Sequence, residues 1–119
     1  MKESYFSDQH FENINFTQPL DKGEYEDCTF RNCNLEYANL SGYNFNDCEF
    51  IDCNLSMMNL VSTAFRDVIF RECKMFGLHF NDCNEFGLSF TFESCLLNNS
   101  IFYKTSIKKT LFRNSKLIE

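Results

Sequence analysis

The chain has 119 residues, of which 24% are charged and 17% are aromatic, and its formal net charge is −6. This length predicts a single domain, and the apolar content excludes a disordered chain. Basic residues gather only in the C-terminal tail, so the broad basic face of a direct nucleic-acid binder is not expected.

The first twenty residues carry Phe6, Phe11 and Phe16 at five-residue spacing. Because this rhythm is lost at Gln18 and Pro19, we predict an irregular first coil or cap over residues 1–20. The segment lacks the apolar stretch of a signal peptide, and no part of the chain has the roughly 18 consecutive apolar residues of a membrane span. The sequence therefore predicts a cytoplasmic protein with no membrane partner.

From Phe30 to Phe80 every fifth residue is large and apolar, and a second core candidate lies two positions before each of them. A period of five fits neither an α-helix nor a long β-strand. It fits a four-sided coil in which each side has five residues and points two side chains inward. Residues 20 positions apart should then stack, and the columns Phe30, Phe50, Phe70 and Leu35, Leu55, Met75 agree with this.

The rhythm breaks at Glu85, where a carboxylate would fall in the core, and it resumes two positions out of phase at Leu97. A two-residue register break within residues 81–91 restores the columns. We therefore predict a bulge or short loop here, in which Gly87 supplies backbone freedom. A simple register correction and a partner-binding bulge are both open interpretations.

Seven cysteines are present, and four of them form one further column: Cys33, Cys53, Cys73 and Cys95. Their spacing fits neither zinc-binding pairs nor a secreted disulfide framework. We predict reduced thiols in the core of a cytosolic protein. Cys83, beside the register break, is the thiol expected to be most accessible.

Catalytic signatures are absent from the sequence. His10 and His79 are far apart, and neither has metal-ligand spacing. No nucleophile motif and no glycine-rich phosphate loop occur. A narrow packed solenoid also leaves little room for a concave substrate pocket. We therefore predict no catalytic residues, no metal site and no cofactor, so the chain is not expected to be an enzyme.

The five-residue units resemble the consensus of the pentapeptide-repeat family. Cys28–Asn32 (CTFRN) and Ala38–Gly42 (ANLSG) are examples, and the resemblance covers about residues 20–119. Within that family, the stretch from Cys48 to Lys109 is similar to the Qnr-type quinolone-resistance proteins. The similarity includes the interruption over Cys83–Phe90.

The resemblance implies an all-β fold, a right-handed quadrilateral β-helix of about 5–6 coils, with one solenoid domain over residues 1–119. It also implies a rod with the width and negative surface of B-form DNA. Qnr-type proteins are thought to bind DNA gyrase and topoisomerase IV and to counter quinolone poisoning. The implied function is therefore an antibiotic-resistance module that acts by DNA mimicry; the alternative is a structural scaffold for another protein partner.

The C-terminal end departs from the family pattern. Qnr-type relatives continue into a helix that helps to form a dimer, whereas this chain stops at Leu117-Ile118-Glu119. A solenoid needs capping at its ends, and a bare β edge invites pairing with another chain. We predict either a truncated protein or a homodimer through the uncapped C-terminal end.

Acidic residues recur with the same 20-residue spacing. Asp27, Asp47 and Asp67 predict one vertical column, and Asp52 and Glu72 predict a shorter one on the adjoining side. We call these five residues the acidic stripe. Stacked like charges cost stability, although a solvated face is the usual explanation of surface charge. Our hypothesis is that the acidic stripe contacts the basic DNA-binding surface of a type II topoisomerase.

Three outward apolar residues form a second candidate site. Tyr37, Met57 and Phe76 are expected to lie near one another on another side of the coil. Single apolar residues are common on protein surfaces, but a contiguous set can mark an interface. We call these three residues the apolar patch and predict that it contributes to partner binding.

Overall fold

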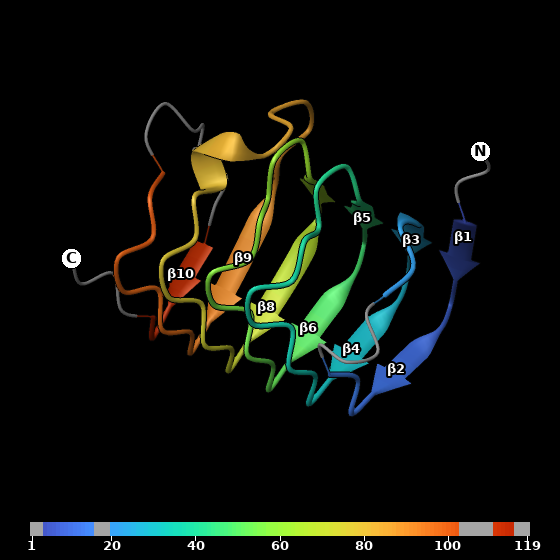
Figure 1. The fold of residues 1–119 in the computed structure, drawn as a ribbon. Coiled ribbons are helices and arrows are strands. Elements are labelled where there is room, and N and C mark those ends of the chain that lie inside the picture. The colour runs from blue at the N-terminus through green and yellow to red at the C-terminus, as the bar shows by residue number, and fades with distance from the viewer. Residues whose placement is uncertain (1–3, 16–19, 103–110, 116–119) are drawn as a thin grey trace.

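The structure is a computed structural model that describes residues 4–15, 20–102 and 111–115 (Figure 1). Its strands pair in parallel with strands about one coil away in the sequence, so backbone hydrogen bonds join successive coils. The predicted right-handed quadrilateral β-helix is confirmed as a parallel β-solenoid of about five turns. No helix among the described residues is long and apolar enough to cross a membrane.

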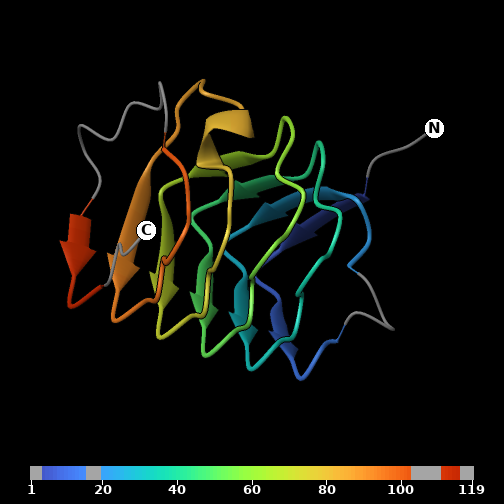
Figure 2. The ribbon, with the colours of Figure 1, turned by 60° about the vertical axis from the view of Figure 1, so that its left-hand side comes forward.

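Two sides of the solenoid are regular parallel sheets (Figure 2). Side one consists of β1 (Ser4–Ser7), β3 (Gly23–Glu26), β5 (Asn44–Asn46) and β7 (Ala64–Arg66). Side two consists of β2 (His10–Glu12), β4 (Thr29–Arg31), β6 (Glu49–Ile51), β8 (Val68–Arg71), β9 (Phe90–Glu93) and β10 (Leu111–Arg113). The described residues 4–15 thus already form sides one and two, although Ser4 pairs with Gly23 at a spacing of 19 residues.

On sides three and four, isolated bridges join successive coils, among them Asn34 with Asn54 and Asn39 with Asn59. Each of these asparagines turns its side chain back onto its own chain. The Oδ1 atom of Asn54 accepts the backbone N–H of Ser56 at 3.2 Å, and that of Asn59 accepts the N–H of Val61 at 3.0 Å. Asparagine therefore stabilises the turn that follows it, as short polar side chains do at such positions.

Stacked aromatic columns form a large part of the core. Phe30 and Phe50 are stacked with ring centroids 4.5 Å apart, and Phe50 and Phe70 follow at 5.3 Å. A second column, which contains Phe45, stands beside the first. The rings of Phe45 and Phe50 pack edge to face, with their centroids 5.4 Å apart. Both geometries are favoured by the ring quadrupole. Because each inward position repeats once per coil, like residues bury one another along the whole solenoid.

A second change of register lies farther along the solenoid. Phe70 of β8 pairs with Phe92 of β9, a spacing of 22 residues, whereas neighbouring regular pairs such as Phe50 and Phe70 are 20 apart. In this coil side one has no strand; the chain instead forms a short 3₁₀ turn, η1 (Phe80–Asp82), followed by a loop over residues 83–89. Glu85 is exposed in that loop, so its carboxylate avoids the cost of burial.

Candidate functional site

Most sides of the solenoid end in a corner residue with a positive φ. Sequence reasoning placed these residues on the surface but missed this conformation. The left-handed region strains most residues and is best tolerated by glycine, asparagine and aspartate. The signal was present in the sequence, because these residue types recur two positions after the central core residue. Examples are Asn32 (φ 53°), Gly42 (φ 79°) and Asp47 (φ 53°).

One corner, between sides one and two, is aspartate in each of four successive coils: Asp8, Asp27, Asp47 and Asp67. We call this column the acidic corner. The backbone N–H of Asp27 donates to Asn46 O at 3.0 Å, and that of Asp47 donates to Arg66 O at 2.9 Å, so the corners stack in register. All four side chains are exposed. Asp8 was missed in the sequence because its spacing is 19 rather than 20 residues.

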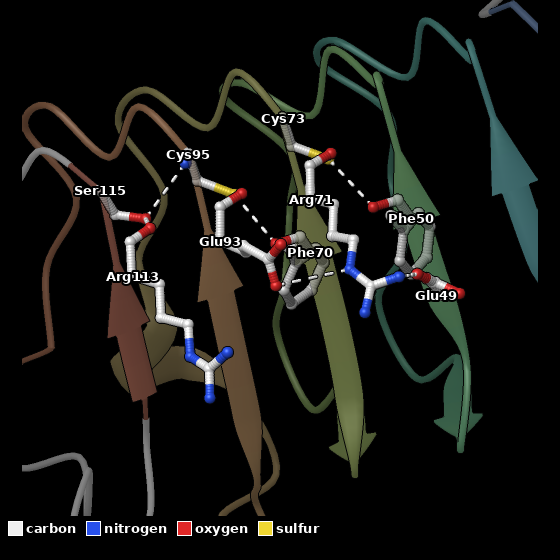
Figure 3. Close-up of polar contacts among 9 residues, drawn as sticks. All are labelled: Glu49, Phe50, Phe70, Arg71, Cys73, Glu93, Cys95, Arg113 and Ser115. Atoms are coloured by element: carbon white, nitrogen blue, oxygen red, sulfur yellow. Dashed lines mark hydrogen bonds and ion pairs between the residues drawn. The ribbon is translucent and has the colours of Figure 1, made fainter.

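The carboxylates of the acidic corner repel one another. Partial desolvation raises the pKa of Asp27, and the neighbouring carboxylates of Asp8 and Asp47 raise it further. Among the described residues the ion pairs lie elsewhere, on side two. There Arg71 bonds Glu49 and lies 3.5 Å from Glu93, so acids and bases neutralise each other along the sheet (Figure 3). The acidic corner has no such partner in the part of the chain that the structure describes.

The other two members of the acidic stripe occupy the next corner, between sides two and three. Asp52 and Glu72 have φ of 53° and 51° and are exposed. Their column continues in neutral residues on both sides, namely Asn13, Asn32, Ser94 and Asn114. Negative charge is therefore continuous along the acidic corner and local at this second corner.

The apolar patch is divided between two neighbouring columns. Tyr37 and Met57 are corner residues of successive coils, 71% and 46% exposed. The backbone N–H of Met57 donates to Phe76 O at 2.9 Å, which places Phe76 next to this corner on side three. The Phe76 ring is half-buried, and the Lys74 ammonium lies 5.6 Å from its centroid. The three residues are therefore neighbours, but Phe76 adds less open apolar surface than expected.

The loop over residues 83–89 is the main irregular feature of the surface. Asn84 Oδ1 accepts the backbone N–H of Phe86 at 3.0 Å, and Arg66 Nε donates to Phe86 O at 3.0 Å. Ser89 Oγ lies 3.3 Å from Asp67 Oδ1, which ties the end of the loop to the acidic corner. The Phe86 ring is 78% exposed. Sequence reasoning placed a loop here but did not single out Phe86.

Comparison with known proteins bears on this geometry. The family described as "Pentapeptide repeat region" matches residues 24–91, which is more than half of the chain. The chain belongs to the pentapeptide-repeat family. No curated protein sequence matches it.

Solved structures of pentapeptide-repeat proteins share the fold. Rfr23, a pentapeptide repeat protein from the cyanobacterium Cyanothece 51142, is similar with a TM-score of 0.70 and 14% identity over 97% of this chain and 88% of that chain. Full-length QnrB1, described as a plasmid-mediated fluoroquinolone resistance protein, is similar with a TM-score of 0.47 and 15% identity over 96% of this chain and 93% of that chain. At these identities the likeness concerns the fold alone.

The thiols of this pentapeptide-repeat chain are all buried and reduced. Cys83 is the most accessible of the seven thiols, as predicted, but at 9% exposure it is still part of the buried core. Burial raises the pKa of the Cys83 thiol to about 12, and the nearby Asp82 raises it as well. Burial likewise raises the pKa of Cys48 to about 12. Such thiols are neutral at physiological pH, which makes them poor nucleophiles and poor metal ligands.

A hollow near the N-terminal end was not expected from a narrow packed solenoid. Its volume is about 350 Å³, and its described lining is mainly apolar, with Leu20, Leu35, Tyr37, Leu40 and Tyr43. The Tyr43 hydroxyl donates to Leu20 O at 2.5 Å, so the one phenol deep in this wall is already bonded. Glu36 is the only carboxylate in the described lining. Within the described ranges, no cluster of His, Cys, Asp and Glu could hold a metal ion.

Proposed function

We propose that this chain is a cytoplasmic, DNA-mimicking interaction module that binds a type II topoisomerase, DNA gyrase or topoisomerase IV, and counters quinolone poisoning. The observation that carries the proposal is the acidic corner. It presents one carboxylate per coil in a vertical row, as a nucleic-acid backbone presents its phosphates. A basic DNA-binding surface is complementary to such a row.

The turn geometry alone does not explain aspartate at these positions. Asparagine has the same shape, tolerates a positive φ and carries no charge. The next corner uses asparagine at Asn13 and Asn32 in the same conformation. Yet the acidic corner keeps aspartate in four coils, although the neighbouring carboxylates raise the pKa of Asp27. A charge that is retained despite this repulsion supports a role outside the fold.

A structural scaffold for another protein is the second candidate, and the apolar patch favours it. Tyr37 and Met57 expose adjoining apolar surface at a corner remote from the acidic one. A contact made through this patch would be insensitive to salt, because it would bury apolar area rather than pair charges. Salt dependence therefore separates the two candidates.

The test is binding of this chain to purified DNA gyrase, together with gyrase supercoiling in the presence of a quinolone. We expect binding that weakens with salt and a partial recovery of supercoiling. Asp47→Lys plus Asp67→Lys should abolish both effects. Glu12→Lys plus Glu36→Lys changes the net charge equally at positions outside the acidic corner and is the matched control. Salt-independent binding, or equal loss in both double variants, contradicts the proposal.

A further inference from the structure

Phe86 stands apart from the other phenylalanines that the structure describes. Its ring is 78% exposed, whereas theirs are buried or partly buried. The fold does not need this ring for packing. Phe90 contacts both Phe65 and Phe80, with ring centroids 5.7 Å and 5.1 Å away, and fills the core of this coil. An exposed phenylalanine forgoes the stabilisation that burial of its ring would give.

The backbone around Phe86 is braced on both sides. Its N–H donates to Asn84 Oδ1 and its C=O accepts from Arg66 Nε, both at 3.0 Å. Gly87 follows with φ of 72°, and a Cβ there would lie 3.1 Å from Arg66 Nε. The turn therefore favours glycine at this position, next to an exposed phenylalanine. A backbone held in this way loses little freedom on binding, which favours affinity.

The chain segment that carries Phe86 is acidic. Asp82 and Glu85 are exposed in the same segment, and Ser89 Oγ connects the loop to Asp67 Oδ1 at 3.3 Å. The nearby cation, Arg66, directs its Nε to the backbone of the loop. Phe86 is thus an exposed apolar side chain in the loop that adjoins Asp67, the last aspartate of the acidic corner.

We infer that Phe86 is the apolar anchor of this interaction module and inserts into an apolar pocket within the basic surface of its partner. The inference rests on the proposed function and adds the residue whose contact slows dissociation of the complex. Charge complementarity specifies the partner chemistry, because carboxylates around the ring require a basic rim around the pocket. A central aromatic residue enclosed by polar contacts is the usual arrangement of a binding hot spot.

The experiment compares Phe86→Ala with Tyr5→Ala, which removes an exposed aromatic side chain on β1, outside both the acidic corner and the apolar patch. Affinity for purified DNA gyrase is measured at several salt concentrations, with dissociation rates. We expect Phe86→Ala to weaken binding at least about tenfold through faster dissociation, with an unchanged dependence on salt. Phe86→Leu should recover most of the affinity, and Tyr5→Ala should stay within about twofold of the unaltered chain.

The other outcomes distinguish failure of the Phe86 anchor from failure of the proposed function. If the unaltered chain binds and Phe86→Ala binds equally well, the anchor is wrong and the proposed function stands. The same holds if Tyr5→Ala alone weakens binding. If the unaltered chain does not bind gyrase, the proposed function and the anchor fall together. Equal thermal midpoints of all variants establish that the loss of affinity does not come from unfolding.

Discussion

The ring of Phe90 packs against the ring of Phe65 with centroids 5.7 Å apart, and it continues the aromatic column of side one across a coil that has no strand there. Phe90 is 1% exposed. The chain gains this contact by adding two residues and turning Glu85 to solvent. The loop over residues 83–89 is therefore the means by which the core stays aromatic.

The packing of Phe90 predicts that alanine substitutions of Phe90 and Phe86, four positions apart, differ sharply in their effect on stability. Phe90→Ala leaves a cavity in the core and should lower the free energy of unfolding by about 3–5 kcal/mol. Phe86→Ala removes an exposed ring and should change it by less than about 0.5 kcal/mol. Urea unfolding followed by circular dichroism measures both. Equal losses in the two variants would show that the loop packs on the core.

The corners predict which substitutions the solenoid tolerates. Asp47 has φ of 53°, a conformation that a β-branched residue adopts at a cost of about 1–2 kcal/mol. Asp47→Val should therefore be less stable than Asp47→Gly by roughly this amount. The urea midpoints of the two variants give the difference. Equal midpoints would mean that the corner relaxes out of the left-handed region.

The buried thiols predict a loss of stability at alkaline pH. An unfolded cysteine ionises near pH 8.5, whereas burial raises the pKa of Cys48 to about 12. The folded state therefore favours the neutral thiol, and its contribution is complete below about pH 8.5 and falls progressively up to about pH 12. At pH 10 the loss should be roughly 2 kcal/mol for this thiol.

Urea unfolding at pH 7 and pH 10 under reducing conditions tests this dependence. Cys48→Ala is the matched control, because it removes the thiol and should show a smaller loss between the two pH values. The variant itself will be less stable at pH 7, so the comparison concerns the change with pH. If Cys48→Ala and the unaltered chain lose equal stability, the thiol is not the titrating group.

The charges on side two should contribute little to stability. Arg71 bonds Glu49 and lies 3.5 Å from Glu93, but its side chain is 43% exposed (Figure 3). Exposed pairs contribute about 0–1 kcal/mol, and salt screens them. Arg71→Met should therefore cost less than about 1 kcal/mol in low salt and less again in 0.5 M NaCl. A larger, salt-independent cost would show that the aliphatic part of Arg71 covers the core.

Much of this fold could be predicted from the five-residue period, because an inward position that recurs once per coil must be apolar. Phe30, Phe50 and Phe70 identify the column and therefore the number of residues per coil. The path of the chain around Glu85 was harder to predict. A break in a period locates an irregular segment, but it does not say which residue, here Phe90, takes the vacated core position.

The candidate site was less predictable for a physical reason. Spacing places Asp27, Asp47 and Asp67 in one column, but it does not reveal the left-handed conformation that makes aspartate acceptable there. It also missed Asp8, whose coil is one residue shorter. Cys83 is the most accessible thiol, as predicted, but proximity to a loop in the sequence does not reveal that its side chain is still buried. The predicted end-to-end dimer through Leu117–Glu119 falls outside the described residues and stays a prediction.

A variant that combines Asp27→Asn, Asp47→Asn and Asp67→Asn tests whether the acidic corner binds the partner. Asparagine keeps the corner geometry and removes three charges, so the urea midpoint should be unchanged or higher. Affinity for DNA gyrase should fall at least about tenfold, and its dependence on salt should become weaker. Unchanged affinity together with a lower urea midpoint would contradict the account, because the aspartates would then serve the fold alone.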